Sequence, residues 1–522
     1  MECQLEALRK CLTVYSVRHA LRNLPPTLDA TYERILINIP QEYRREAHCA
    51  LQLLTVSYRP LKLHEMAEAV AIDPETGIFD PENRLRDPEA LLEICSSLLI
   101  LSGYVIHLTF INCSRDELRF AHYSVHEHLV SGRTSQRTLY NFGTVEREAH
   151  QLFVRLSMIY LPSFIKTDAS LVNAFADGDG VAMDHIEEMF PFLEYTSMFW
   201  PEHLHDADIG NFPPPEFMLT KQLFDPTFHF KFYQIWSRVM QRHGDDEGGG
   251  GFSSDDSITT QAAYRLYHAS FLGLTELVRW LLHEGADPNV PSGAGYGYAL
   301  IAAVAVGNEA IVILLLDLGA DIEASWCGNK ALHIAAKHDN EALLRVLLDR
   351  GARIDGPGPG ETALWCGVGF RNYSAIRLLI ERGAEVNALG GNDEYPLYMA
   401  AVVGDETMVQ LLLENGALVN AKSGECGYAL QTAARWGRIE TVRLLLGKGA
   451  GVNAEGGRFG CALQAAATCS SQEAGMQIAQ LLLDNGANVN LTGGEYGSAL
   501  GAARERGHIL MVDLLLKSRA GA

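Results

Sequence analysis

The sequence lacks the signatures of several enzyme classes. It contains no Gly-x-x-x-x-Gly-Lys-Ser/Thr phosphate loop, no Gly-x-Ser-x-Gly nucleophile elbow and no His-Glu-x-x-His zinc motif. Each of these patterns places a reacting group at a fixed point of the backbone. We therefore expect no catalytic residue, no cofactor and no hydrolysis of ATP by this chain alone.

Positive charge is also scarce. The 42 Lys and Arg residues stand against 64 Asp and Glu residues, which gives a net charge of -22, and no run of basic residues marks a recognition helix. An acidic protein repels the phosphate backbone of nucleic acids. Nucleic acid is therefore a poor candidate partner.

The ten cysteines are scattered, without a Cys-x-x-Cys pair. This indicates free thiols in a reducing compartment and no metal site. The first residues, Met1 to Glu6, lack the basic and apolar regions of a signal peptide. The most apolar window, 91–111, is interrupted by Glu93 and His107, so we expect no membrane span. The sequence predicts a cytoplasmic protein, with the nucleus as an open alternative.

What the chain does contain is a repeat over its second half. A Leu-Leu phrase followed by glycine recurs, with the glycines at 285, 319, 351, 383, 416, 449 and 486. A period near 33 residues predicts a solenoid of stacked units. Each glycine can adopt the left-handed turn that ends a helix.

A second phrase, Ala-Leu-x-x-Ala-Ala, precedes the first by about half a period, as in 331–336, 429–434 and 462–467. Its small residues allow a first helix to lie close to its neighbours. The two coupled phrases resemble the ankyrin repeat, with seven complete units and a truncated eighth, Leu500 to Ala520. The Thr-Pro-Leu-His tetrad of that family is nowhere intact. We therefore expect apolar packing to contribute more stability than side-chain hydrogen bonds.

The first half reads as short helices with two strand candidates. Proline pairs and capping residues place helices after Thr27 and Pro40 and over about 63–70, a loop over 72–81, and strands at 104–111 and 117–121. We expect a mainly α fold: a winged-helix and helical N-terminal region followed by an ankyrin-repeat α-solenoid. The expected parts are a helical remnant (1–39), a winged helix (40–134), a helical connector (135–242), a flexible Gly/Asp linker (243–258) and the ankyrin repeats (259–522).

Three separated phrases carry a second resemblance: residues 20–36, Arg59-Pro60-Leu61, and 119–125. They are similar to the region that follows the nucleotide-binding domain in fungal NACHT (NLR-like, STAND) proteins, and to the winged helix of GPI inositol-deacylase-type proteins. The resemblance implies that His122 matches a histidine that contacts a bound diphosphate. It would sense ADP only if a NACHT domain were supplied, and the alternative is a histidine hydrogen-bonded to the backbone.

Two further clusters carry ligand-type side chains. His122, His126, Glu127 and His128 are expected to be exposed side chains at a helix start, because no further ligand completes a metal site. The segment 202–208, Glu-His-Leu-His-Asp-Ala-Asp, is expected to be a solvated loop.

The solenoid surface is the remaining candidate for function, because solenoids present turn tips and first-helix residues on one concave face. Aromatic and arginine side chains dominate binding energies at interfaces. The candidate protein-binding residues are Tyr296, Trp326, His338, Arg371, Arg435, Trp436, Phe459, Tyr496, Arg504 and Arg506. For Phe459 and Tyr496 the sequence leaves open whether they contact a partner or pack between adjacent hairpins.

The sequence thus favours a non-catalytic protein-binding scaffold. Its ankyrin repeats would bind another protein through the concave face, and its winged helix would pack against a NACHT-type domain as a regulatory module of an NLR-like system. One alternative is the C-terminal part of a nucleotide-switch ATPase whose phosphate-loop domain is absent from this chain. A second alternative is a winged-helix DNA-binding regulator.

Overall fold

The structure, a computed structural model, describes most of the chain in segments. These are residues 27–95, 98–102, 117–131, 145–165, 185–186, 188–207, 221, 224, 258–292, 295–356, 361–424 and 427–520. The chain divides into two compact units, residues 1–251 with 275–280, and residues 252–274 with 281–522. The expected strand 104–111 and the linker residues 243–257 lie outside the described residues.

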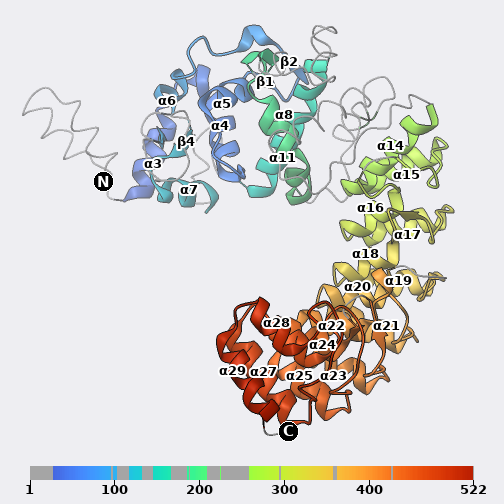
Figure 1. Ribbon diagram of the computed structural model, residues 1–522. Coiled ribbons are helices and arrows are strands. Elements are labelled where there is room, and N and C mark those ends of the chain that lie inside the picture. Colours follow the sequence, from blue (N-terminus) through green and yellow to red (C-terminus); the bar gives the residue numbers. More distant parts are fainter. Residues whose placement is uncertain are drawn as a thin grey trace, which may run out of the picture. The chain divides into compact units, whose positions relative to one another are not determined.

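The first unit is mainly helical, with two short antiparallel hairpins (Figure 1). Its elements are α3 (Leu28–Ile37), η1 (Gln41–Tyr43), α4 (Arg44–Val56), α5 (Leu63–Val70), β1 (Ile72–Asp73), β2 (Ile78–Phe79), η2 (Pro81–Asn83), α6 (Ala90–Ile94), β3 (Leu99–Leu101), β4 (Leu118–Phe120), α7 (Tyr123–Val130), α8 (Glu146–Ile165) and α11 (Leu193–Asp206).

Local signals set the ends of the first helices. The Thr27 side chain accepts a hydrogen bond from the backbone of Ala30, which begins α3 as the capping pattern predicts. Tyr32 of α3 is buried, and its hydroxyl lies 2.7 Å from the Ser124 hydroxyl of α7. This contact holds the apolar side of α3 against α7.

The hairpins differ in part from expectation. β3 pairs with β4 in the register Leu99 to Phe120, so a strand ends at Leu101, before the segment where the first strand was expected. Residues 72–81, expected to be a loop, hold the hairpin of β1 and β2, with Ile72 opposite Phe79. Ile72 is buried, and that burial stabilises a pairing of two residues per strand that the turn-rich sequence does not suggest.

Two buried carboxylates of α5 tie this unit together. Glu65, only 1% exposed, forms a bidentate ion pair with Arg59 at 2.6 and 2.8 Å, and Arg59 also reaches Glu194 of α11 at 3.1 Å. Glu65 further accepts the backbone N–H of Lys62 at 2.7 Å, so the third residue of α5 satisfies a backbone donor at the start of the helix. The ion pair therefore links α5 to α11.

The second carboxylate, Glu68, is also buried. It accepts hydrogen bonds from Arg84 at 2.5 and 2.6 Å and from the Tyr160 hydroxyl of α8 at 2.8 Å. Burial and the neighbouring carboxylate hold the pKa of Tyr160 well above its usual value. The Tyr160 hydroxyl therefore stays protonated and donates its hydrogen bond to Glu68 throughout the physiological pH range. Helix α8, expected within a connector, packs on α4 and on both strands of the β1–β2 hairpin, inside the same compact unit.

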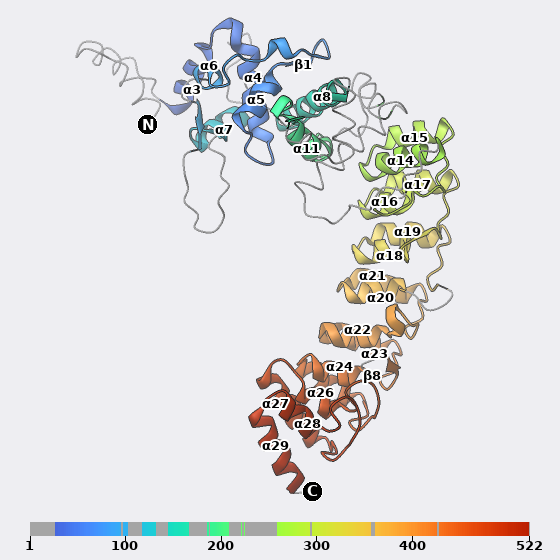
Figure 2. The same ribbon diagram turned by 45° about the horizontal axis from the view of Figure 1, so that its top comes forward.

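The second unit is a stack of short antiparallel helix pairs (Figure 2). After α14 (Ile258–Phe271) and α15 (Thr275–His283), of which residues 275–280 are grouped with the first unit, the pairs are α16 (Ala299–Ala305) with α17 (Glu309–Asp317), α18 (Ala331–Lys337) with α19 (Glu341–Asp349), α20 (Ala363–Gly369) with α21 (Tyr373–Glu381), α22 (Pro396–Val403) with α23 (Glu406–Glu414), α24 (Ala429–Arg435) with α25 (Ile439–Gly447), α26 (Ala462–Ala467) with α27 (Gln472–Asp484), and α28 (Ala499–Glu505) with α29 (Ile509–Ala520). Two of the connecting tips hold short hairpins, β5 (Ser325–Trp326) with β6 (Asn329–Lys330) and β7 (Lys422–Ser423) with β8 (Gly427–Tyr428).

The repeated glycines adopt the expected left-handed turn. Gly383 has a φ of +91° and Gly416 of +92°, and the other five lie between +84° and +92°. Each follows the second helix of a pair, so the Leu-Leu phrase before it lies at the end of that helix. Leu347, Leu379 and Leu412 of these phrases are fully buried.

A ladder of side-chain hydrogen bonds joins successive repeats in addition to the buried apolar core. The Asn420 amide donates to the carbonyl oxygen of Gly449 at 3.0 Å, while its oxygen accepts the N–H of Gly451 at 2.7 Å. Three other asparagines form the same two bonds to the following repeat, namely Asn289, Asn387 and Asn453. In register with them, Glu323 and Asp355 each accept one backbone N–H, from Arg353 at 2.8 Å and Glu385 at 2.9 Å.

Candidate protein-binding surface

The first helices of the pairs all end at a residue of the same register. The positions that directly follow α16, α18, α20, α22 and α24 are Val306, His338, Phe370, Gly404 and Trp436. In Figures 1 and 2 these first helices follow one side of the stack and the second helices follow the other. The row of first-helix ends is called the inner row below.

Large apolar side chains are exposed along the inner row. Phe370 is 60% exposed, Trp436 54% and Val306 43%. The helices that carry them are built from small buried residues, as Ala429, Ala433 and Ala434 of α24 show. Because alanines let these helices pack closely, a large side chain fits at the end of the helix and not within it. Exposed aromatic groups in a row are typical of a surface that binds a partner.

Trp436 lies within a small aromatic and cationic group. The guanidinium carbon of Arg435 is 5.9 Å from the centre of the Trp436 ring and 5.9 Å from that of Phe459. These are cation–π distances. Phe459 itself is 5% exposed, so it packs within the tip and anchors Arg435, while the indole of Trp436 remains accessible.

Arg371 and His338 extend the inner row. Arg371 is exposed, has a left-handed backbone with φ +62°, and donates through Nη2 to the carbonyl oxygen of Val403 in the next repeat at 3.0 Å. His338 is exposed directly after α18. The structure therefore places His338 on the inner row with Trp436, and Arg371 directly beside the row at Phe370.

The remaining candidates lie farther from the row centre. Arg504 and Arg506 are exposed at the end of α28, and Arg506 donates to the hydroxyl of Tyr496 at 3.1 Å. Tyr496 is half-buried by this contact. The tip and the inner row are thus joined at this repeat.

The tip aromatics of the first repeats pack on their neighbours. The Trp326 ring lies directly over Gly297, where an added Cβ would meet it at 2.2 Å, and it meets the edge of Tyr298 with ring centres 6.4 Å apart. The backbone N–H of Tyr296 donates to the Tyr267 hydroxyl at 3.2 Å. Trp326 and Tyr296 are both half-buried, so their packing between hairpins accounts for much of their surface.

Basic residues predominate along the first helices and their ends, although the chain is acidic. Lys337, Arg371, Arg435, Arg504 and Arg506 lie there with the acidic Asp339, Asp405 and Glu505. The sequence reasoning missed Phe370 and Val306. Each lies 32 residues from His338, and Trp436 lies 66 residues, two repeat periods, after Phe370, so the repeat spacing is a signal that could have found them.

In the first unit, His122 caps a helix. It is exposed, and its Nδ1 accepts the backbone N–H of Ser124 at 3.2 Å and lies 2.7 Å from the Ser124 hydroxyl. His126 is half-buried, but His128 is 2% exposed and its Nδ1 lies 2.9 Å from Asp29. The expectation of exposed histidines is therefore wrong for His128, because α3 covers that face of α7.

The segment 202–206, expected to be a solvated loop, is the last part of α11. His203 is fully buried, its ring stacks on Phe153 with centres 3.8 Å apart, and its Nδ1 lies 2.8 Å from Nδ1 of His150. Burial, with the nearby His150, lowers the pKa of His203 to about 3. The polar sequence suggested solvent exposure, whereas α8 packs over this side of the helix.

Comparison with known proteins agrees with the repeat geometry. A family model described as "Ankyrin repeats (3 copies)" matches residues 266–357, 300–389 and 364–456. This region of the chain consists of ankyrin repeats, a protein–protein interaction module.

One curated relative is the "Azaphilone pigments biosynthesis cluster protein L" of Monascus ruber, which is 30% identical over 319 residues. The match covers 58% of this chain and 61% of that protein, so the chain spans about three fifths of the relative's length.

Solved ankyrin structures also align. The human ASB11 ankyrin repeat domain is 26% identical, with 41% of this chain and 96% of that chain covered and a TM-score of 0.35. An ankyrin repeat domain of Acinetobacter baumannii is 34% identical, with 36% and 96% covered and a TM-score of 0.33. The ankyrin repeat domain of Bcl-3 is 28% identical, with 42% and 97% covered and a TM-score of 0.36.

Among the described residues, the helices are too short or too polar for any of them to cross a membrane.

Proposed function

We propose that this chain is a non-catalytic scaffold that binds another protein through the inner row of its ankyrin repeats. The observation that carries the proposal is the recurrence of exposed Val306, Phe370 and Trp436 at one register of every second repeat, with exposed His338 at the same register between the first two. Apolar groups that recur at one register can each be buried by an extended partner, and that burial stabilises a complex by removing apolar area from water.

The residue types fit this role. Tryptophan and arginine are enriched among the side chains whose truncation weakens complexes by about 2 kcal/mol or more. Arg435 lies beside Trp436, and Arg371 follows Phe370 directly. The basic residues of the row favour a partner segment that carries apolar and acidic side chains.

The test is capture of a partner by the full chain with matched surface variants. Trp436→Ser and Phe370→Ser remove apolar groups from the inner row. Leu418→Ser is the control, since Leu418 is 58% exposed and follows the second helix of its pair. A partner retained by wild type and by Leu418→Ser but lost, by about tenfold in affinity or more, from the two row variants supports the proposal. Equal retention by all four proteins contradicts it.

For the first unit, we propose a winged-helix regulatory module that packs against a NACHT-type domain in an NLR-like system. Support comes from the element order, in which α4, α5 and, after the β1–β2 hairpin, α6 precede the antiparallel pair β3–β4 and then α7, together with the phrases that resemble this region. Cross-linking in native extract is expected to join Lys62, 41% exposed, to a protein with a phosphate loop. Recovery of cross-links to DNA-bound proteins instead would favour a DNA-binding regulator.

The same proposal includes the absence of catalysis by the chain itself. Purified protein incubated with Mg²⁺ and ATP is expected to release phosphate no faster than a heat-denatured sample. Turnover above that blank would favour the nucleotide-switch ATPase alternative.

A further inference from the structure

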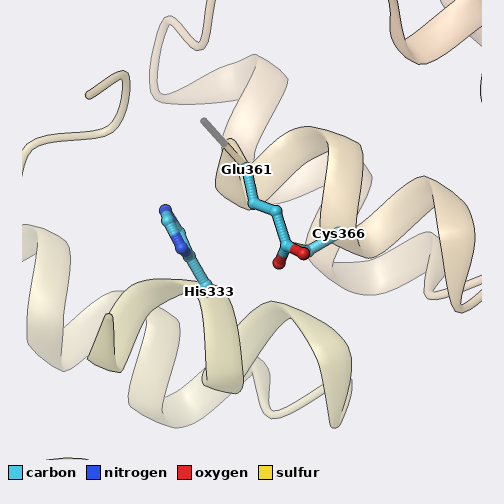
Figure 3. Close-up of side chains that lie close together, drawn as sticks. All are labelled: His333, Glu361 and Cys366. Carbon is cyan, nitrogen blue, oxygen red and sulfur yellow. The ribbon is translucent and has the colours of Figure 1, made fainter. Parts of the chain in front are cut away.

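Three side chains of metal-ligand type meet between two successive ankyrin repeats. His333 lies in α18, while Glu361 and Cys366 lie just before and within α20. One ligand atom from each lies within 4.8 Å of the others. Figure 3 shows the His333 imidazole beside the Glu361 side chain, whose carboxylate lies next to Cys366.

The His333 side chain has the protonation state and the unpaired nitrogen that a metal ligand needs. His333 is 7% exposed, and its Nδ1 has no hydrogen-bond partner among the described residues. Burial is the main cause that lowers the pKa of His333 to about 4, so its imidazole is neutral at physiological pH. A neutral imidazole with a free lone pair is the form that binds metals. Leaving a buried nitrogen without a partner destabilises the folded protein, and a bound cation removes that cost.

The other two side chains are spaced as ligands of one ion. The Cys366 sulfur lies 3.4 Å from Oε2 of Glu361. Ligands of a tetrahedral zinc ion lie about 3.5 Å apart, given Zn–S and Zn–O bonds of about 2.3 and 2.1 Å. Cys366 is fully buried, and that burial raises the pKa of its thiol, so the thiolate forms there when a cation offsets its charge.

An ammonium group now occupies the position next to the carboxylate. Lys337 Nζ lies 2.8 Å from Oε2 of Glu361 and 2.7 Å from the side-chain oxygen of Asn329. Burial alone would raise the pKa of Glu361, but the hydrogen bond and charge of Lys337 lower it. The carboxylate is therefore ionised, and a divalent cation competes with the lysine for it.

We propose that His333, Glu361 and Cys366 bind one zinc-type divalent cation, with a water molecule at the fourth position. A set of one sulfur, one nitrogen and one oxygen ligand suits Zn²⁺ and its spectroscopic substitute Co²⁺, and does not suit Mg²⁺ or Ca²⁺, which take oxygen ligands. Binding releases the Cys366 proton to solvent and displaces the Lys337 ammonium from Glu361. Because α18 and α20 belong to successive repeats, the ion also cross-links them.

The experiment is a Co²⁺ titration of the full chain, free of affinity tags, stripped with chelator and kept reduced. We expect one equivalent to bind with a sulfur-to-cobalt charge-transfer band, and Zn²⁺ to abolish that band by displacement. Cys366→Ser should remove the band, and His333→Gln should weaken binding at least about tenfold, since even the outer-shell partners of metal ligands contribute that much. Cys461→Ser is the control, because Cys461 is an equally buried thiol in another repeat.

A variant that is expected to bind the metal more tightly separates loss of the site from loss of folding, because a damaged core would weaken binding. Lys337→Gln removes the competing ammonium from a half-buried side chain and should tighten Co²⁺ binding. The metal-free circular dichroism of each variant shows whether it is folded. A wild-type titration without the charge-transfer band, a band that persists in folded Cys366→Ser, or an unchanged affinity in Lys337→Gln would each overturn the site.

Discussion

The side chain of Asn420 bridges to Gly449, 29 residues later, through the amide that donates to the Gly449 carbonyl oxygen at 3.0 Å. The oxygen of the same amide accepts the Gly451 N–H at 2.7 Å. One side chain thus satisfies a carbonyl and an N–H at the start of the next repeat's tip, where the left-handed turn leaves backbone groups without helical partners.

Asn420→Ala should lower the free energy of unfolding by about 1 kcal/mol, since each exposed hydrogen bond contributes about 0.5 kcal/mol or somewhat more. The local readout is hydrogen exchange at the Gly451 amide, which loses its acceptor. Gln480→Ala is the control, because Gln480 bonds within its own helix, to Asp484. Unchanged exchange at Gly451 would show that the bridge is not formed in solution.

Gly383→Ala should destabilise the protein by about 1 kcal/mol, because Gly383 has φ +91° and an alanine there is strained. Space is not the cause, since an added Cβ would meet no atom within 4 Å. The matched control is Gly447→Ala. Gly447 also has open space but lies in α25, so alanine should stabilise the helix by up to about 1 kcal/mol. Urea denaturation that moves both midpoints in the same direction would contradict this reading.

Glu65→Gln should destabilise the first unit by roughly 3 kcal/mol, because it removes the charge from a buried ion pair and leaves Arg59 partly uncompensated. Glu440→Gln, which breaks the exposed pair with Arg443, should change stability by less than about 0.5 kcal/mol. Thermal melts followed by circular dichroism compare the two variants. Equal effects would mean that the Glu65 carboxylate is solvated.

Acid should destabilise the first unit through His203. Its pKa is about 3 in the folded protein and about 6.5 when unfolded, so the unfolded state binds a proton that the folded state does not. Stability is fully present above pH 6.5 and falls with pH below it, by about 2 kcal/mol at pH 5 from this group. His203→Phe keeps the stacking on Phe153 and removes this dependence. Hydrogen exchange in α8 and α11 between pH 7.5 and 5 measures it, and identical pH profiles for the two proteins would contradict the assignment.

Local signals predicted much of the fold. The period of the glycines predicted the repeat and the left-handed turn at Gly383. Thr27 predicted the start of α3, and the helix predicted over 63–70 is α5. These features depend on side chains and backbone within a few residues of each other, so a single stretch of sequence contains the cause.

Features that depend on distant partners were not predicted. The burial of His203 requires Phe153 and His150 from α8, about 50 residues away, and the sequence around it is as polar as a loop. The cluster of His333, Glu361 and Cys366 spans two repeats and matches no short metal motif. The exposure of Phe370 was not predicted, because it depends on where α20 ends, and neither repeated phrase contains that residue.

The two acidic positions in the asparagine ladder make the stack mechanically uneven. Asparagine supplies both a donor and an acceptor, whereas Glu323 and Asp355 supply one bridging bond each to the next repeat. Under tension, we expect neighbouring repeats to separate first at these two joints, because one bridging bond there replaces two. His333 of α18 and Cys366 of α20 belong to the two repeats that the Glu323–Arg353 bond joins, so an ion held between them would reinforce the first of these joints.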